Sequence, residues 1–311
     1  MTANKVSSTV DHVAIHQERA GQRLDNFLMA QLKGVPRSVI YRIIRTGQVR
    51  INGHRAKPAS RLELGDMVRI PPASIRADRP TDIPPSVLQL LADAICFEDQ
   101  GVIVINKPAG MAVHRGSGLA WGVVNVMRKL RPEHKVDLVH RLDRETSGCM
   151  LLALSGDALR ELNQQILKNR VEKHYLCLLD GHLQQSVVEV EQPIAKAERA
   201  GERFMCIDPL GKPAHTTFRK LQHCGPCTLV EAELHSGRTH QIRVHANHLD
   251  MPLVGDKCYA PATRQKFWKS RDVRRLFLHA HRLQFFTPNG EQQLVSSQLP
   301  PELKVLLNEL E

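Results

Sequence analysis

The sequence lacks several features that would place it in a special class of protein. No apolar run approaches the roughly 18 residues of a membrane span, and residues 1–21 lack the basic-then-apolar layout of a secretory signal. The 7 cysteines are irregularly spaced, which indicates free thiols in a reducing compartment rather than a disulfide framework. Neither an internal repeat nor a low-complexity tract is present. We therefore expect a cytoplasmic globular protein without a membrane partner.

Acidic residues are also few compared with basic ones. Lys and Arg number 43 against 32 Asp and Glu, which gives a net charge of +11. Such an excess usually serves a polyanionic partner or an acidic membrane surface, and we expect nucleic acid. Hydrophobic residues at 42% exclude wholesale disorder, and a length of 311 residues allows one large domain or two unequal ones.

Acids are entirely absent from residues 33–61, although this segment contains eight Lys or Arg residues. Apolar positions at helical spacing after Arg23 and after Pro36 predict a helical hairpin, and residues 49–70 alternate around an Asn52-Gly53 turn. A merely soluble face normally mixes both signs of charge, so a phosphate-binding face is the better interpretation. The basic residues expected to bind RNA here are Arg37, Arg42, Arg45, Arg50, Arg55 and Lys57.

Residues 21–70 resemble the S4 RNA-binding module in the segments RLDNFL, VPRSVIYRIIRTGQVRINGHRAK and LELGDMVRI. The resemblance implies a module that holds RNA by shape and charge and carries no chemistry. Residues 1–20 show no sustained hydrophobic period, so we expect a flexible tail. The proline-rich residues 71–86 predict a semi-rigid linker, and residues 87–311 form the remaining domain.

The remaining domain combines short β-rich runs with a few helical stretches. Its later strands follow one another with little helix between them, which favours antiparallel neighbours over βαβ crossovers. Cys224-Gly-Pro-Cys227 has the spacing of a redox dithiol, but the strand patterns around it favour a hairpin turn, and one such pair is a weak zinc signal. The expected fold class is α+β: a small N-terminal S4-type αβ module and a larger domain with a mixed, mainly antiparallel sheet flanked by helices and loops.

The densest group of reactive side chains lies in the segment VHRLDRETSGCMLLAL. An isolated Arg-Leu-Asp is usually a polar turn, but here Val139 and Leu142 bracket the charges with apolar positions. Gly148 lets the chain turn closely into a buried strand, so the segment has a rigid base. A carboxylate held among cations stays ionised, as a nucleophile or a base must. Asp143 is therefore the candidate catalytic residue.

The segment HRLDRETSG resembles the active-site motif of the RluA-type pseudouridine synthases. The segments NKPAGMAVHRG at 106–116, VEKHYLCLLDG at 171–181 and LHSGRTHQIRVHANHLDMPLVGDKCYA at 234–260 resemble that family as well. The resemblance implies that Asp143 is the catalytic aspartate, that Tyr175 stacks on the base and that Arg243 pairs with the aspartate. It also implies that residues 87–311 are the catalytic domain.

The implied reaction detaches uracil from C1′ of its ribose and rejoins it through C5. No redox change is involved, so we expect neither a cofactor nor a metal. Attack at C1′, attack at C6 and removal of a ribose proton stay open as routes. The uridine must leave its stack, and we expect Arg141 either to fill the gap or to contact a phosphate. Arg238 is expected at a phosphate, although Arg238 and Arg243 are exchangeable on the sequence alone.

An S4 module in front of such a domain is typical of the subgroup that modifies large-subunit ribosomal RNA. The expected function is therefore the isomerisation of specific uridines to pseudouridine in large-subunit (23S) ribosomal RNA by a monomer. Two alternatives are the same chemistry on transfer RNA and a non-catalytic RNA-binding ribosome assembly factor.

Overall fold

The structure is a computed structural model that describes residues 10–32, 35, 37–72, 82–99, 101–114, 121–199 and 202–310. The chain divides into two compact units, Met1–Thr81 and Asp82–Glu311. None of the helices in these described ranges has the length and apolar content of a membrane span.

The expected linker over residues 71–86 needs a correction at its end. Its residues 73–81 lie outside the described ranges. Pro85 and Ser86 belong to helix α3 (Pro85–Asp93) rather than to a linker. Proline suits the first turn of a helix, because the N–H that it lacks would have no partner there.

The first unit has one apolar core, shared by two helices and a four-stranded antiparallel sheet. Its elements are β1 (Asp11–Ala14), the 3-10 helix η1 (Gln17–Arg19), α1 (Leu24–Gln31), α2 (Arg37–Arg45), β2 (Arg50–Ile51), β3 (His54–Arg55) and β4 (Met67–Ile70), and the sheet order is β1-β4-β2-β3. The predicted helical positions Leu24, Phe27 and Ile40 have no exposed surface. Strands β2 and β3 pair around Asn52-Gly53, and both turn residues have the positive φ that a type I′ hairpin requires.

Residues 11–19 are not the loose tail that the sequence suggested. Strand β1 pairs along its whole length with β4, and Ile15 is only 1% exposed in the core of the unit. A strand of four residues is too short to show a hydrophobic period of its own. Its place is decided by hydrogen bonds to β4, which follows about 50 residues later in the chain.

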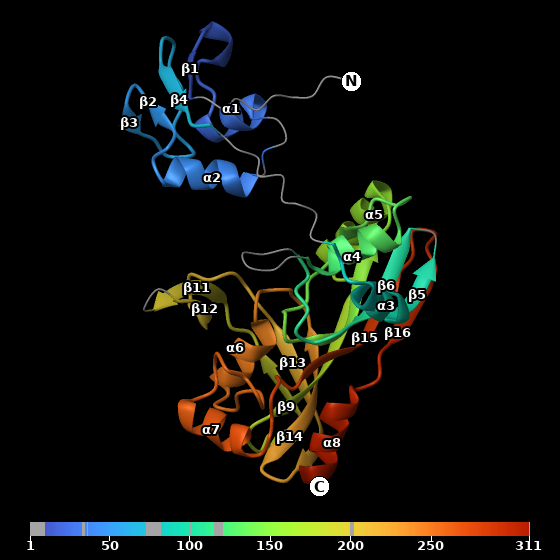
Figure 1. Cartoon of the computed structure of the whole chain (residues 1–311). Coiled ribbons are helices and arrows are strands. Elements are labelled where there is room, and N and C mark those ends of the chain that lie inside the picture. The colour runs from blue at the N-terminus through green and yellow to red at the C-terminus, as the bar shows by residue number, and fades with distance from the viewer. Residues whose placement is uncertain are drawn as a thin grey trace. The chain divides into compact units, whose positions relative to one another are not determined.

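The second unit is built on a ten-stranded sheet (Figure 1). The strands are β5 (Ile95–Asp99), β6 (Val102–Lys107), β7 (Asp137–Leu138), β8 (Ser147–Ala153), β9 (Glu172–Leu179), β10 (Val187–Val190), β13 (Thr216–Cys224), β14 (Cys227–Leu234), β15 (Leu278–Phe286) and β16 (Gln292–Ser296). They run in the order β10-β13-β14-β9-β15-β8-β6-β5, with β16 beside β15 and β7 beside β8. Among the described strands of this sheet only β8 and β15 pair in parallel, so the predicted mixed, mainly antiparallel sheet is confirmed.

Helices cover both faces of this sheet where β8 lies. The described helices of the second unit are α3, α4 (Val123–Leu130), α5 (Gly156–Leu167), α6 (Gln241–His248), α7 (Ala262–Ser270) and α8 (Pro301–Leu310), and a separate two-stranded ribbon pairs β11 (Ile194–Arg199) with β12 (Glu202–Ile207). Met150 and Leu152 of β8 pack in one cluster with α4, whereas Cys149 and Leu151 pack in another with α5. Because successive strand side chains point to opposite faces, β8 is buried on both sides, which explains its unbroken apolar run.

The Cys224-Gly-Pro-Cys227 segment is a hairpin turn, as predicted. Cys224 ends β13, Cys227 begins β14, and the two residues pair across the turn. Both thiols are buried, and burial raises the pKa of Cys227 to about 12. Buried cysteines are inert core side chains, so the burial of both residues argues against a redox centre.

Candidate active site

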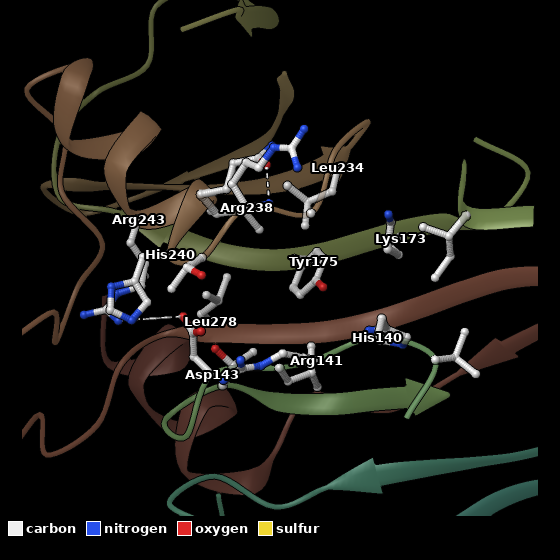
Figure 2. Close-up of a pocket in the computed structure, with 18 residues that line it drawn as sticks. His140, Arg141, Asp143, Lys173, Tyr175, Leu234, Arg238, His240, Arg243 and Leu278 are labelled. Carbon is white, nitrogen blue, oxygen red and sulfur yellow. Dashed lines mark hydrogen bonds and ion pairs between the residues drawn. The ribbon is translucent and has the colours of Figure 1, made fainter. Parts of the chain in front are cut away.

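A cavity of about 260 Å³ in the second unit brings together the candidate residues of the catalytic domain. Its walls come from the loop 139–146 between β7 and β8, from β9, from the start of α6 and from the ends of β14 and β15. Figure 2 shows Asp143, Tyr175 and Arg243 around one space, although they lie far apart in the sequence. Arg141 and Arg238 line the same cavity.

The loop that carries Asp143 is anchored at its beginning by core contacts. Val139 and Leu142 are 8% and 4% exposed, as their apolar character predicted. His140 Nε2 accepts a hydrogen bond from the backbone N–H of Leu151 at 3.0 Å. Burial lowers the pKa of His140 to about 4, so its ring is the neutral acceptor that this bond needs.

The other side of the loop is held by Lys107 at the end of β6. Lys107 has no exposed surface, and its Nζ donates to the carbonyl groups of Pro108, Met111 and Arg144 at 2.9, 2.9 and 3.1 Å. Arg144 directly follows Asp143, so the bond to its carbonyl group ties the Asp143 loop to the core. Three carbonyl groups satisfy the three donors of an ammonium group, although burial lowers the pKa of Lys107 to about 7. This role of Lys107 was not assigned from the sequence, although the lysine follows the apolar run VIVIN and lies in the family-like segment NKPAGMAVHRG.

Gly148, which the sequence assigned to a close turn into a buried strand, also lets β8 approach β15 closely. Its φ is +112°, and a Cβ at this position would lie 2.2 Å from the carbonyl oxygen of Ala280. Only glycine therefore fits here. Ala280 also pairs with Tyr175 of β9, so the contact fixes the distance between the Asp143 loop and the strand that carries the tyrosine.

Two nitrogen atoms face the carboxylate of Asp143 (Figure 2). Arg243 Nη1 and His240 Nε2 each lie 3.7 Å from Asp143 Oδ2. Such a separation is an ion-pair distance, longer than a hydrogen bond of about 2.7 to 3.2 Å. Arg243 is only 8% exposed, and its Nε and Nη2 donate to Asp256 at 2.7 and 2.8 Å. This bidentate pair leaves Nη1 of Arg243 for Asp143.

Asp256, which was not among the candidate residues predicted from the sequence, makes the burial of Arg243 possible. Its side chain is 1% exposed, and its Oδ1 accepts hydrogen bonds from the backbone N–H groups of Cys258 and Tyr259 at 2.8 and 3.0 Å. Burial alone would raise the pKa of Asp256, but the hydrogen bonds from Arg243 and the backbone lower it overall. A buried cation is tolerated when an ionised, hydrogen-bonded partner compensates it. The available signal was an aspartate within the family-like segment 234–260.

Tyr175 lies on β9 and is 5% exposed. Its cross-strand partners are the small residues Ala232 on β14 and Ala280 on β15, and the tyrosine lines the cavity from β9. Burial raises the pKa of Tyr175 well above its usual value, so the hydroxyl stays protonated. Lys173, two residues earlier, also lines the cavity, and burial lowers its pKa. Lys173 was not among the candidate residues predicted from the sequence.

Arg141 and Arg238 are exposed residues among those that line the cavity. Arg238 Nε donates to the carbonyl oxygen of Pro213 at 2.9 Å. Of the two arginines that the sequence left exchangeable, Arg243 is the one that faces Asp143, while Arg238 is the more exposed.

The basic residues proposed from the sequence for RNA binding in the first unit are all exposed. Arg50 donates to the carbonyl groups of Gly47 and Gly53 at 3.3 and 3.1 Å, which orients its guanidinium beside the β2–β3 turn. None of these basic residues forms an ion pair with an acid in the described part of the chain, so their charges are free for an external anion. The set comprises Arg37, Arg42, Arg45, Arg50, Arg55 and Lys57.

Comparison with known proteins agrees with this geometry. Residues 101–248 match the model of a family described as RNA pseudouridylate synthase, and residues 22–68 match the S4 domain. A relative from Haemophilus influenzae, named ribosomal large subunit pseudouridine synthase C, is 41% identical over 310 residues, which cover 98% of this chain and 96% of the relative. The chain belongs to the RNA pseudouridylate synthase family. A protein of the same name from Escherichia coli is 43% identical over 309 residues, or 97% of each chain.

Solved structures support the membership of this pseudouridine synthase in the family. The human RNA pseudouridylate synthase domain containing 1 is 28% identical, with a TM-score of 0.59 over 70% of this chain and 87% of the human chain. The human RNA pseudouridylate synthase domain containing 4 is 26% identical, with a TM-score of 0.60 over 72% and 95% of the two chains. The resemblance that the sequence motifs indicated, including the S4 module, is therefore confirmed.

Proposed function

We propose that this synthase isomerises specific uridines in large-subunit ribosomal RNA to pseudouridine in the cytoplasm, with Asp143 as the catalytic residue. The observation that carries the proposal is the half-buried carboxylate of Asp143, 3.7 Å from Arg243 Nη1, in a cavity that Tyr175 also lines. The ribosomal substrate is supported by the names of relatives that match almost the whole chain, S4 unit included. The same relatives disfavour transfer RNA as the substrate, and the grouping of Asp143, Tyr175 and Arg243 around one cavity disfavours a non-catalytic assembly factor.

In this reaction the N1–C1′ bond breaks, the uracil turns, and a C1′–C5 bond forms. The proton leaves C5, and N1 gains one, so no electrons are exchanged with a cofactor. Asp143 acts on the extruded nucleoside by attack at C1′ or C6 or by removal of a ribose proton, and each route requires its carboxylate. Arg243, itself held by Asp256, fixes the orientation of that carboxylate.

The remaining cavity residues bind the nucleotide in this proposal. Tyr175 stacks on the base, since its ring is flanked by the small side chains of Ala232 and Ala280. Arg141 fills the vacated stack or contacts a neighbouring phosphate, and Arg238 contacts a phosphate near the cavity. The basic residues of the S4 unit bind the RNA backbone, because their charges lack partners in the described part of the chain.

The proposal is tested by tritium release from RNA labelled at C5 of uridine, because pseudouridine formation expels the proton at C5. Large-subunit ribosomal RNA from a strain without this protein is the substrate, and bulk transfer RNA from the same strain is the comparison. We expect release from the ribosomal RNA only. Release from transfer RNA alone would refute the proposed substrate, and release from neither RNA would refute the activity.

A further inference from the structure

His240 occupies an unusual backbone position directly before α6. It caps the helix with φ 56° and ψ 19°, in the left-handed region that residues other than glycine seldom adopt. Such a conformation persists when surrounding contacts hold it, and it is often found at functional sites. Here the imidazole contacts two polar groups from other parts of the chain, Asp143 and Tyr259.

Tyr259 contacts the nitrogen of His240 that faces away from Asp143. The hydroxyl oxygen of Tyr259 lies 2.8 Å from His240 Nδ1 and accepts a hydrogen bond from the backbone N–H of Met205 at 3.2 Å. Because a backbone N–H can only donate, the hydroxyl proton of Tyr259 is free to point at Nδ1. When this proton is donated to Nδ1, Nδ1 is the acceptor and the ring proton lies on Nε2, the nitrogen that faces Asp143.

The charges around the ring agree with a neutral imidazole. The groups that face it are the carboxylates of Asp143 and Asp256, the guanidinium of Arg243 and the Tyr259 hydroxyl. Burial lowers the pKa of His240, and Arg243 lowers it further, although the two carboxylates oppose this shift. A neutral ring with its proton on Nε2 still donates a hydrogen bond to a carboxylate.

We infer that His240 is a positioning residue whose Nε2–H, together with Nη1 of Arg243, holds Oδ2 of Asp143. This inference rests on the proposed function, in which Asp143 acts on the nucleoside. Both nitrogen atoms approach the same oxygen, and no described residue hydrogen-bonds Oδ1, so Oδ1 is the oxygen that faces the nucleotide. The two 3.7 Å separations shorten to hydrogen bonds when a nucleotide fills the cavity. Tyr259 acts through His240, because its hydrogen bond to Nδ1 fixes the tautomer of the imidazole ring.

The His240→Gly variant tests this role without endangering the fold, because glycine adopts a φ of 56° without strain. We expect kcat for tritium release to fall at least about tenfold, and KM to change less than about threefold, because phosphate contacts dominate RNA binding. Imidazole added to His240→Gly should raise the rate at least about threefold, because it can occupy the space of the missing ring. His240→Gln keeps a hydrogen-bond donor and should therefore retain more activity than His240→Gly. The matched control is His248→Gly, an exposed histidine of the same helix, which should keep the wild-type rate and ignore imidazole.

A second measurement does not depend on activity. Nitrogen-15 NMR of the free wild-type enzyme should show His240 with Nε2 protonated and Nδ1 unprotonated at neutral pH. Tyr259→Phe keeps the ring, 5.0 Å from the Arg243 guanidinium, and should remove this preference. Wild-type kcat in His240→Gly, the absence of imidazole rescue, or a proton on Nδ1 in the wild type would each overturn the inference. Failure of the wild type to release tritium would instead refute the proposed function, while the NMR result would still decide the tautomer of His240.

Discussion

Asp143→Asn is the substitution that tests the proposed site most directly. It removes the charge and the nucleophile but preserves the size of the side chain. The fold should tolerate the change, because Asp143 is 28% exposed and Arg243 remains paired with Asp256 at 2.7 and 2.8 Å. Any loss of activity therefore reports chemistry rather than unfolding, which circular dichroism and the melting temperature verify.

No neighbouring acid among the described residues is placed to replace Asp143. Asp256 is bound by both Nε and Nη2 of Arg243, and Glu145 has a 51% exposed side chain that lies 3.7 Å from Arg144. The rate should therefore fall by more than about a thousandfold, which corresponds to roughly 4 kcal/mol of barrier. RNA affinity should change by no more than about fivefold, because phosphate contacts carry most of the binding.

The assay is tritium release from uridine C5 under single-turnover conditions, because it reports the chemistry without assuming which uridine reacts. Glu145→Gln is the matched control for loss of one carboxylate from the same loop, and it should keep nearly the wild-type rate. If Asp143→Asn released tritium at even about a tenth of the wild-type rate, Asp143 would not be the catalytic residue.

Three further predictions follow from the same structure. Tyr175→Phe should retain most of the rate, whereas Tyr175→Ala should lose about 1 to 3 kcal/mol of base contact; wild-type rates in both variants would remove Tyr175 from the site. Replacing Arg42 and Arg45 by Gln should leave the rate on saturating short RNA unchanged but reduce the salt dependence of long-RNA binding by roughly 0.7 to 0.9 in slope per lost contact, so an unchanged slope would exclude them as phosphate contacts. Burial lowers the pKa of His279 to about 4, so the unfolded state binds a proton first as the pH falls below about 6.5, and stability is lost between pH 6.5 and 4. The free energy of unfolding, measured with urea, should fall by about 2 kcal/mol more between pH 7 and pH 5 in the wild type than in His279→Gln. An equal fall in both proteins would contradict this assignment.

Local signals decided how much of the fold could be predicted. The helical spacing of Leu24, Phe27 and Ile40, and the turn at Asn52-Gly53, depend only on residues near in sequence, and the structure agrees with both. Strand β1 could not be predicted, because its four residues are held by β4, far along the chain. The prolines near residue 85 indicated a linker, but proline both breaks a helix and begins one, and only the downstream packing of α3 distinguishes the two.

In the candidate site, too, residues close in sequence could be predicted to act together, whereas contacts between distant residues could not. Asp143 could be singled out because its apolar anchors and Gly148 are contiguous with it, whereas Arg238 and Arg243 stayed exchangeable because both lie in one short basic segment. What distinguishes them is Asp256, since a buried guanidinium needs an ionised partner and an exposed one does not. Sequence spacing cannot indicate which arginine pairs with the Asp256 carboxylate, because this contact depends on the path of the chain after α6. Replacement of Asp256 leaves all three predicted catalytic residues in place. It should nevertheless release Arg243 from its orientation, and it should therefore weaken the ion pair between Arg243 and Asp143 as strongly as a change in Arg243 itself.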